Sequence, residues 1–331
     1  MGRPGMKRIA VIGAGSWGLA LALQAARTGA AVHLWARNPT ARLANGAMPR
    51  LSAHPLPDSI RVTDNLKVDA DMTLVAVPMQ HLAAVLARLD TASPLVLCCK
   101  GVRPDSLHFP LDILADVKPG HAGAVLSGPN FAHEIAAGLP AAAVIAAKED
   151  GLARHLADGL GTSTFRLYDS TDVIGVQLGG AAKNVIAIAA GATIGAGLGE
   201  NARAALVTRG LAEISRLAES LGGKAATMSG LAGMGDLLLT CTGTSSRNFR
   251  VGHALGEGMS PHDAEKTAGG VAEGVATSQA LTTLAGQQQV SVPVMEAVAD
   301  IVTGRVALKD ATEQLLTRPP GPEMKTTGFL N

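Results

Sequence analysis

Short apolar runs alternate with helical stretches along the first half of the chain. Runs at 7–12, 31–35, 72–77 and 95–99 predict buried β-strands, and shorter runs at 124–126, 141–147 and 164–167 predict further strands. Residues 19–27 and 81–89 between these runs carry helical spacing. Repeated alternation of strand and helix predicts a doubly wound, mostly parallel α/β sheet over residues 6–168.

The strand signal disappears after residue 168. Apolar positions at helical spacing predict helices at 172–198, 201–221, 249–255, 272–287, 292–302 and 308–316. We therefore expect a second, all-α C-terminal domain over residues 169–318, which holds the substrate and the catalytic groups. The prolines from residue 319 on stop the last helix, so residues 319–331 are expected to be a disordered tail.

The stretch 172–198 is apolar on nearly all sides, so other parts of the chain must cover it. Lys183 and Asn184 lie in its middle. Burial removes water from an ammonium and lowers its pKa, so Lys183 requires a fixed partner or a chemical task. Six glycines and the Lys-Asn pair argue against a membrane span. A plain core helix whose lysine reaches the surface stays open as an alternative.

The motif GAGSWG at 13–18 directly follows the first predicted strand. In the G-x-G-x-x-G spacing, Gly13 permits a tight turn, Gly15 lets the backbone approach a pyrophosphate, and Gly18 allows close helix–strand packing. The helix that follows presents unpaired N–H groups to phosphates. Glycine-rich turns also occur for structural reasons, but a second strand at βαβ distance favours a Rossmann-like dinucleotide-binding domain here.

The residues after the second predicted strand indicate which dinucleotide is favoured. An acidic residue there bonds the ribose hydroxyl of NAD, whereas a basic residue accommodates the 2′-phosphate of NADP. This chain reads Ala36-Arg37-Asn38, without a carboxylate. Because the Arg37 guanidinium suits a phosphate dianion, NADP(H) is favoured and NAD(H) stays possible.

Several polar residues follow strands or open helices in ways that suit a site. Lys100 comes directly after a strand, at the sheet edge where open α/β sheets bind ligands, although a solvated loop lysine has the same sequence context. Asn130 closes a strand–turn–helix junction at 127–130. Asp236 suits a partner for Lys183, or else the N-cap of the next helical turn. The cluster 245–248 (SSRN) opens a helix and suits a phosphate, or else serves only as a helix cap.

Composition excludes several other classes of protein. The chain is 47% hydrophobic and 17% charged, which is typical of globular proteins. Its net charge is +1 without a basic run, so we expect no nucleic-acid partner. Three cysteines and nine histidines show no disulfide or metal-ligand spacing, so no metal is expected. Since the N-terminus also lacks a signal-peptide pattern, we expect a cytoplasmic protein without an integral membrane segment.

The chain closely resembles NAD(P)-dependent glycerol-3-phosphate dehydrogenases of the cytosolic, bacterial type. The resemblance runs from about residue 7 to about residue 318 and rests on seven motifs: GAGSWG at 13, CKG at 99, SGPNFAHE at 127, GAAKNV at 180, LAGMGDLLLTC at 231, SSRNFRVG at 245 and VAEG at 271. The sequence departs from the family at 51–56 (LSAHPL), where an aromatic residue is frequent and His54 takes its place.

Motifs and resemblance together imply a role for each residue of the site. Lys183 is expected to be the catalytic acid/base, and Lys100, Asp236 and Asn184 complete the catalytic centre. The expected cofactor contacts are Gly13, Gly15, Ser16, Trp17, Gly18, Arg37, Lys100, Ala132, Arg247, Val271 and Glu273. The expected substrate contacts are Lys100, Gly128, Asn130, Lys183, Asp236, Thr240, Ser246, Arg247 and Asn248.

The implied reaction is the reversible reduction of dihydroxyacetone phosphate by NAD(P)H to sn-glycerol 3-phosphate, which supplies the backbone of phospholipids. A hydride would reach C2 while Lys183 protonates the oxygen, and the partner is thus a small phosphorylated substrate. A homodimer suits the architecture. Two alternatives stay open: a hydroxy-acid dehydrogenase, which leaves the SSRN cluster without a reason, and a cofactor sensor, which does not need a buried lysine.

Overall fold

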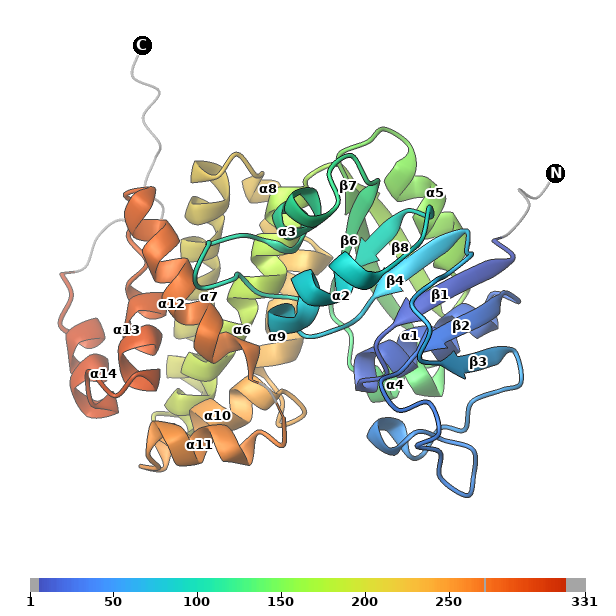
Figure 1. Cartoon of the computed structure of the whole chain (residues 1–331). Helices are drawn as coiled ribbons and strands as arrows, with labels where there is room; N and C mark the ends of the chain where they lie inside the picture. The colour runs from blue at the N-terminus through green and yellow to red at the C-terminus, as the bar shows by residue number, and fades with distance from the viewer. Residues whose placement is uncertain (1–5, 271, 320–331) are drawn as a thin grey trace, which may run out of the picture.

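The computed structural model describes residues 6–270 and 272–319 of the chain. Figure 1 shows a sheet with helices on its faces, joined to a group of helices. Val271, which we expected to contact the cofactor, and residues 320–331 of the predicted tail lie outside the described residues.

The sheet has eight strands in the order β3-β2-β1-β4-β5-β6-β7-β8. All neighbours are parallel except β6 and β7, so the prediction of a doubly wound, mostly parallel sheet is confirmed. The strands are β1 (Arg8–Ile12), β2 (Ala31–Trp35), β3 (Ile60–Thr63), β4 (Met72–Val75), β5 (Leu95–Leu97), β6 (Gly123–Ser127), β7 (Ala141–Ala147) and β8 (Phe165–Ser170). The strand β3 was not predicted from the sequence, because it is an edge strand with only one fully buried residue.

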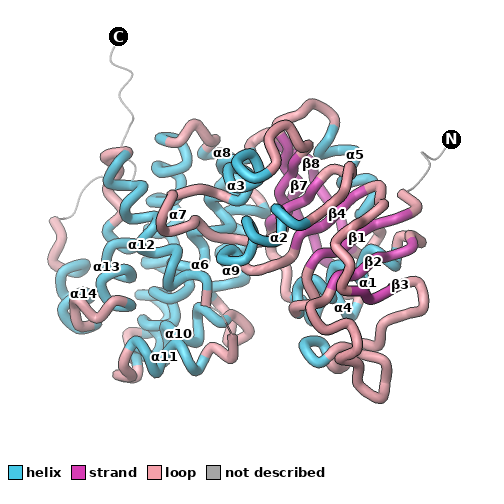
Figure 2. The backbone as a smooth tube through the Cα atoms, in the orientation of Figure 1, coloured by secondary structure: helices cyan, strands magenta, loops and turns pink. Residues whose placement is uncertain are grey.

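Both faces of the sheet are covered by helices (Figure 2). Ile9 and Val11 of β1 pack in one core cluster with α1 (Ser16–Arg27), α4 (Ala132–Ala137) and α5 (Leu152–Leu160). Ala10 and Ile12 pack in the opposite cluster with η2 (Met79–His81), α2 (Leu82–Arg88) and α3 (Pro110–Val117). Because alternate residues face opposite sides and both sides are buried, such strands read as continuous apolar runs.

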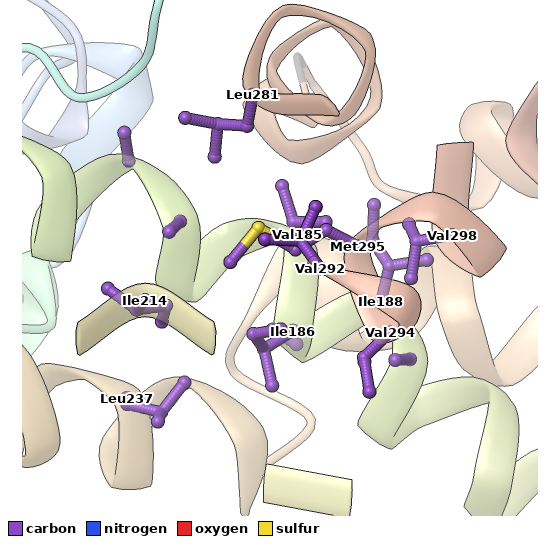
Figure 3. Close-up of a cluster of buried hydrophobic side chains, with 14 of the residues drawn as sticks. Val185, Ile186, Ile188, Ile214, Leu237, Leu281, Val292, Val294, Met295 and Val298 are labelled. Atoms are coloured by element: carbon purple, nitrogen blue, oxygen red, sulfur yellow. The ribbon is translucent and has the colours of Figure 1, made fainter. Parts of the chain in front are cut away.

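The helices after the sheet surround α6 (Val173–Gly195). They are α7 (Gly199–Ser220), α8 (Ala225–Met228), η3 (Leu231–Gly235), α9 (Asp236–Cys241), α10 (Arg247–Gly256), α11 (Pro261–Thr267), α12 (Glu273–Gln287), α13 (Pro293–Val302) and α14 (Leu308–Leu316). Figure 3 shows apolar side chains of α6, among them Val185 and Ile188, packed against those of neighbouring helices. α6 is long and apolar enough to cross a membrane, but 94% of its most apolar 18-residue stretch is buried inside the protein, as expected of a core helix.

Two helices of this group touch through their backbones. A Cβ on Gly191 of α6 would lie 2.0 Å from the carbonyl oxygen of Phe249 in α10, and a Cβ on Gly252 of α10 would lie 1.9 Å from that of Ile188. No real side chain fits at such distances, so glycine is required on both helices at this crossing. α6 and α10 are thereby held in close contact.

The last strand, β8, continues to Ser170, and the chain then enters α6. Asp172 caps α6 by accepting a hydrogen bond from the N–H of Gly175 at 2.9 Å. The division of the chain into domains at residue 168 stays a prediction.

Candidate active site

Three elements meet at the carboxyl edge of the sheet. Lys100 follows β5, Ser127 ends β6, and Gly180 lies on α6 one turn before Lys183. A Cβ on Gly180 would lie 2.6 Å from Ser127 Oγ and 3.5 Å from Lys100 Cδ. Gly180 therefore leaves the space that the Ser127 hydroxyl occupies, and the Lys100 side chain lies at van der Waals distance from the same point of α6.

Asp236 is fully buried and binds both lysines of the site. Its Oδ2 accepts a hydrogen bond from Lys100 Nζ at 2.5 Å, and its Oδ1 accepts one from Lys183 Nζ. The predicted partnership of Asp236 with Lys183 is present. The alternative role as an N-cap is not, because Gly235 occupies the cap position of α9. Two ammonium groups against one carboxylate leave a net positive charge in a buried place.

Each ammonium keeps one N–H group free among the described residues. Lys183 Nζ donates to Asp236 and to Thr240 Oγ1 at 2.9 Å, and Lys100 Nζ donates to Asp236 and to the carbonyl oxygen of Gly128 at 3.3 Å. Since an ammonium has three N–H groups, one remains on each lysine for a ligand oxygen.

Burial lowers the pKa of Lys183 from 10.5 to about 8. Asp236 opposes this shift and the positive charge of Lys100 adds to it. An amine that titrates near neutral pH can both give and take a proton, which is what general acid–base catalysis requires. The alternative of a core helix whose lysine reaches water does not apply, because Lys183 is only 8% exposed.

Asn184 and Asn248 connect three helices. Asn248 Nδ2 donates to Asn184 Oδ1 at 2.9 Å, and Asn248 Oδ1 accepts from the N–H of Gly274 in α12 at 3.0 Å. Both residues are buried. The amide oxygen of Asn248 is therefore used by the fold, and one Nδ2–H remains for a ligand.

The start of α10 carries the other members of the SSRN cluster. Ser246 caps the helix, since its Oγ accepts from the N–H of Phe249 at 3.2 Å, and its hydroxyl proton remains available. Arg247 is exposed at the first helical position and lies against Gly270, where an added Cβ would come within 3.1 Å of Nη1. The N-terminal end of α10 thus offers the Arg247 guanidinium, the Ser246 hydroxyl and the free backbone N–H groups of the helix together.

Glu273, the first residue of α12, faces the same region. Burial raises the pKa of its carboxyl group, while the charges of Arg247, Lys100 and Lys183 hold that pKa down. The three cations act on Glu273 only because they lie near it. The predicted cofactor residue and the predicted catalytic residues are thus close together.

The glycine turn has the geometry of a dinucleotide site. Gly13 has a φ of +119°, and a Cβ there would lie 2.6 Å from the Ala76 carbonyl oxygen. A Cβ on Gly15 would instead face open space, and α1 has no side-chain cap at its N-terminus. These features fit a pyrophosphate, which would bind the free N–H groups at the start of α1. Trp17 packs against the core, and Arg37 is exposed after β2.

Among the described residues, three buried side-chain polar atoms have no hydrogen-bond partner: Ser127 Oγ, Asn130 Nδ2 and Asn130 Oδ1. Ser127 is the last residue of β6 and Asn130 lies on the turn that follows, so both are near Gly128 (whose carbonyl oxygen binds Lys100) and Ala132 at the start of α4. Buried polar atoms are costly without partners, so these atoms indicate a ligand. Asn130 was predicted to be a site residue and Ser127 was not, although a hydroxyl at the end of a predicted strand is visible in the sequence.

Within 6–270 and 272–319, no group of three or more His, Cys, Asp or Glu residues is arranged to hold a metal ion. The three thiols are reduced in this structure, and burial raises the pKa of Cys98 and Cys241 to about 12. Such thiols are poor nucleophiles at neutral pH. The chemistry of the site therefore rests on its lysines and carboxylates.

Two family models match the chain over most of its length. The model for the N-terminus of NAD-dependent glycerol-3-phosphate dehydrogenase matches residues 8–153, and the model for its C-terminus matches residues 172–313. The glycerol-3-phosphate dehydrogenase [NAD(P)+] of Gluconobacter oxydans is 52% identical over 319 residues, which cover 95% of this chain and 98% of that protein. The enzyme of the same name from Acidiphilium cryptum is 54% identical over 93% of this chain and 96% of its own length.

A solved structure shares the whole architecture. The crystal structure of glycerol-3-phosphate dehydrogenase from Coxiella burnetii superposes with a TM-score of 0.88 at 37% identity, covering 95% of this chain and 100% of that chain. The similarity spans both the sheet and the helices that carry the site.

Proposed function

The chain belongs to the NAD-dependent glycerol-3-phosphate dehydrogenase family, and we propose how its own residues perform the reaction. It is an NAD(P)-dependent oxidoreductase that interconverts dihydroxyacetone phosphate and glycerol 3-phosphate. This identity decides against the hydroxy-acid dehydrogenase and the cofactor sensor that the sequence left open. The roles of individual residues are our proposal.

Lys183 is the acid/base. When bound, the reduced nicotinamide supplies the hydride for C2 of the substrate. The free N–H of Lys183 then gives its proton to the oxygen on C2, and the free N–H of Lys100 binds the same oxygen as its charge grows. The observation that carries this proposal is the shared carboxylate: Asp236 aligns both ammonium groups and helps to keep Lys183 protonated despite burial.

The start of α10 holds the substrate phosphate. Arg247 pairs with the phosphate as a charge-assisted donor, the Ser246 hydroxyl donates to it, and the helix N-terminus adds backbone N–H groups. Asn248 contributes its remaining N–H and otherwise positions α10 against Asn184. Binding energy from this non-reacting phosphate orients C2 toward Lys183.

The cofactor binds along the sheet edge. The first turn of α1 binds the pyrophosphate through the backbone of Gly15, Ser16 and Trp17, and Arg37 binds the adenosine end. Ser127 and Asn130 supply hydrogen bonds near the reacting groups, because their buried polar atoms require partners. Ala132, Glu273 and Val271 complete the cofactor contacts, as the family resemblance implies.

Three further points belong to the same proposal. The enzyme prefers NADP(H) over NAD(H), because Arg37 follows β2 where NAD-selective sites have an acid. It acts in the cytoplasm as a homodimer, which the family resemblance supports. Its product there supplies the glycerophosphate backbone of phospholipids.

The test is the decay of reduced-nicotinamide absorbance after dihydroxyacetone phosphate is added to protein and NADPH or NADH. We expect decay with both cofactors and faster decay with NADPH. Lys183→Met should abolish turnover and leave NADPH binding nearly unchanged, because the methionine fills a similar volume without a proton to give. Appreciable turnover by this variant would rule out Lys183 as the acid. Equal or faster decay with NADH would rule out the NADP preference alone.

A further inference from the structure

The segment between β2 and β3 carries an unusual concentration of positive charge. Residues 36–57 contain Arg37, Arg42 and Arg50 but neither aspartate nor glutamate, whereas the whole chain has 28 basic and 27 acidic residues. All three arginines are exposed. Among the described residues, none of the three guanidinium groups has a hydrogen-bond or ion-pair partner. Such a segment is suited to bind an anionic ligand.

One of these arginines is attached to the dinucleotide site. Ser16 Oγ, on the first residue of α1, donates a hydrogen bond to the carbonyl oxygen of Arg50 at 2.9 Å. Met48, which precedes η1 (Pro49–Leu51), and Leu51, the last residue of η1, are buried in the same core cluster as Leu19 of α1. In Figure 1 this part of the chain is the blue loop beside α1. The main chain of Arg50 is therefore held at the start of the helix that would bind the pyrophosphate.

Arg42 lies in the same segment but is not held in this way. It precedes a tight turn in which the N–H of Leu43 bonds to the Ala47 carbonyl oxygen at 2.9 Å. Leu43 itself is 41% exposed, so this turn projects from the core. Arg42 and Arg50 thus have the same charge and are both exposed, but only Arg50 is bonded to α1 through its main chain. Arg42 is therefore a matched control.

The Ser16 hydroxyl also has a defined task. A hydroxyl has one proton, and that of Ser16 is donated to the Arg50 carbonyl oxygen. Ser16 can therefore donate to a phosphate only through its backbone N–H. Its side chain positions Arg50.

We propose that Arg50 is a second cation for the ribose 2′-phosphate of NADP(H), acting beside Arg37 and held in place by the Ser16 hydroxyl. In this fold the ribose would be held by the residue after β2 and the pyrophosphate by the first turn of α1. A phosphate dianion there can accept from two guanidinium groups at once. This inference rests on the proposed NAD(P)(H) site and names a residue that discriminates between the two cofactors.

The experiment is isothermal titration of the full chain with adenosine 2′,5′-bisphosphate and, separately, with ADP, which lacks the 2′-phosphate. For Arg50→Ala we expect about ten-fold weaker binding of the bisphosphate, since a charge-assisted hydrogen bond is lost, and unchanged binding of ADP. Ser16→Ala should weaken bisphosphate binding in the same selective way but less. Arg42→Ala should leave both affinities within about two-fold.

Three results would overturn the proposal. Unchanged bisphosphate affinity in Arg50→Ala would mean that Arg37 acts alone. An equal loss for both ligands would place Arg50 on the 5′-phosphate that the two ligands share. An equal loss in Arg42→Ala would mean that the segment acts only through its overall charge. Because Arg50 is exposed, the variant should fold, which circular dichroism checks. If it still reduces dihydroxyacetone phosphate with NADH, the proposed function stands whatever the fate of Arg50.

Discussion

Lys183 shares the Asp236 carboxylate with Lys100, and its pKa allows the pH dependence of the enzyme to be predicted. In the proposed mechanism, reduction requires Lys183 protonated, and oxidation of glycerol 3-phosphate requires it neutral. With the pKa of Lys183 at about 8, the kcat for reduction should fall about ten-fold for each pH unit above this value. The kcat for oxidation should rise with pH and level off above the same value. The two directions thus serve as controls for each other.

Asp236→Asn is the informative perturbation, because it removes the charge of Asp236 and keeps its shape. Asp236 is 0% exposed and bound to both ammonium groups, so no water replaces the lost carboxylate directly. An opposite charge at such a distance raises a pKa by about one to three units, which equals about 1.4 to 4 kcal/mol. The pKa of Lys183 should therefore drop by that amount in the variant.

The assay is the steady-state kcat in both directions between about pH 6 and 10, for the wild type and Asp236→Asn. We expect both pH limbs of the variant to move toward lower pH, so that reduction near neutral pH is slow while oxidation is less affected. Limbs that stay in place would refute the claim that Asp236 sets the pKa of Lys183. Limbs that move in opposite directions would show that two different groups titrate.

Two further variants test other parts of the molecule. Arg247→Ala should raise the KM for dihydroxyacetone phosphate by about 10- to 100-fold because a phosphate contact is lost; an unchanged KM would remove Arg247 from the phosphate site. Glu213 is 2% exposed, accepts N–H bonds from Val294 and Met295, and has its pKa raised by burial from 4.5 to about 7. Its stabilising contribution is thus complete below pH 4.5 and lost as the pH rises through about 7. The unfolding free energy of Glu213→Gln relative to wild type should therefore rise by about 3 kcal/mol across this window, and urea denaturation at several pH values would contradict this if the difference stayed constant.

The parts of the fold that could be predicted from the sequence are those whose residue pattern occurs in only one kind of element. Parallel strands buried on both faces leave continuous apolar runs, so β1, β2 and β4 were visible. The edge strand β3 is half exposed and reads IRVT, which does not differ from many loops. The helix α3 was likewise not identified, because its eight residues show too little of the helical period. The helix α5 was also not identified, although its buried residues Ala153, Leu156, Ala157 and Leu160 recur at helical spacing.

Some contacts of the site could also be predicted from the sequence, and others could not. A lysine inside an apolar helix requires a counter-charge, so the partnership of Lys183 with Asp236 was predictable. The second lysine on the same carboxylate was not predicted, because Lys100 and Asp236 lie 136 residues apart in the chain and no residue pattern links them. The bonds of Asn248 to α6 and α12 join segments far apart in the chain, and residue types alone do not reveal such contacts.

In the proposed site, the backbone contact between α6 and α10 fixes how far the phosphate-binding group lies from the proton donor. Lys183 is on one helix and Arg247 begins the other, and the glycines Gly191 and Gly252 hold the two main chains together without intervening side chains. The distance between phosphate and proton donor is therefore built into the main chain, where changes of side-chain size cannot adjust it. With Arg247 on the phosphate and Lys183 at C2, as proposed, we expect a substrate to be selected by the number of bonds between its phosphate and its carbonyl carbon. Widening the choice to longer sugar phosphates would require moving a helix, which exchanging side chains at the rim does not achieve.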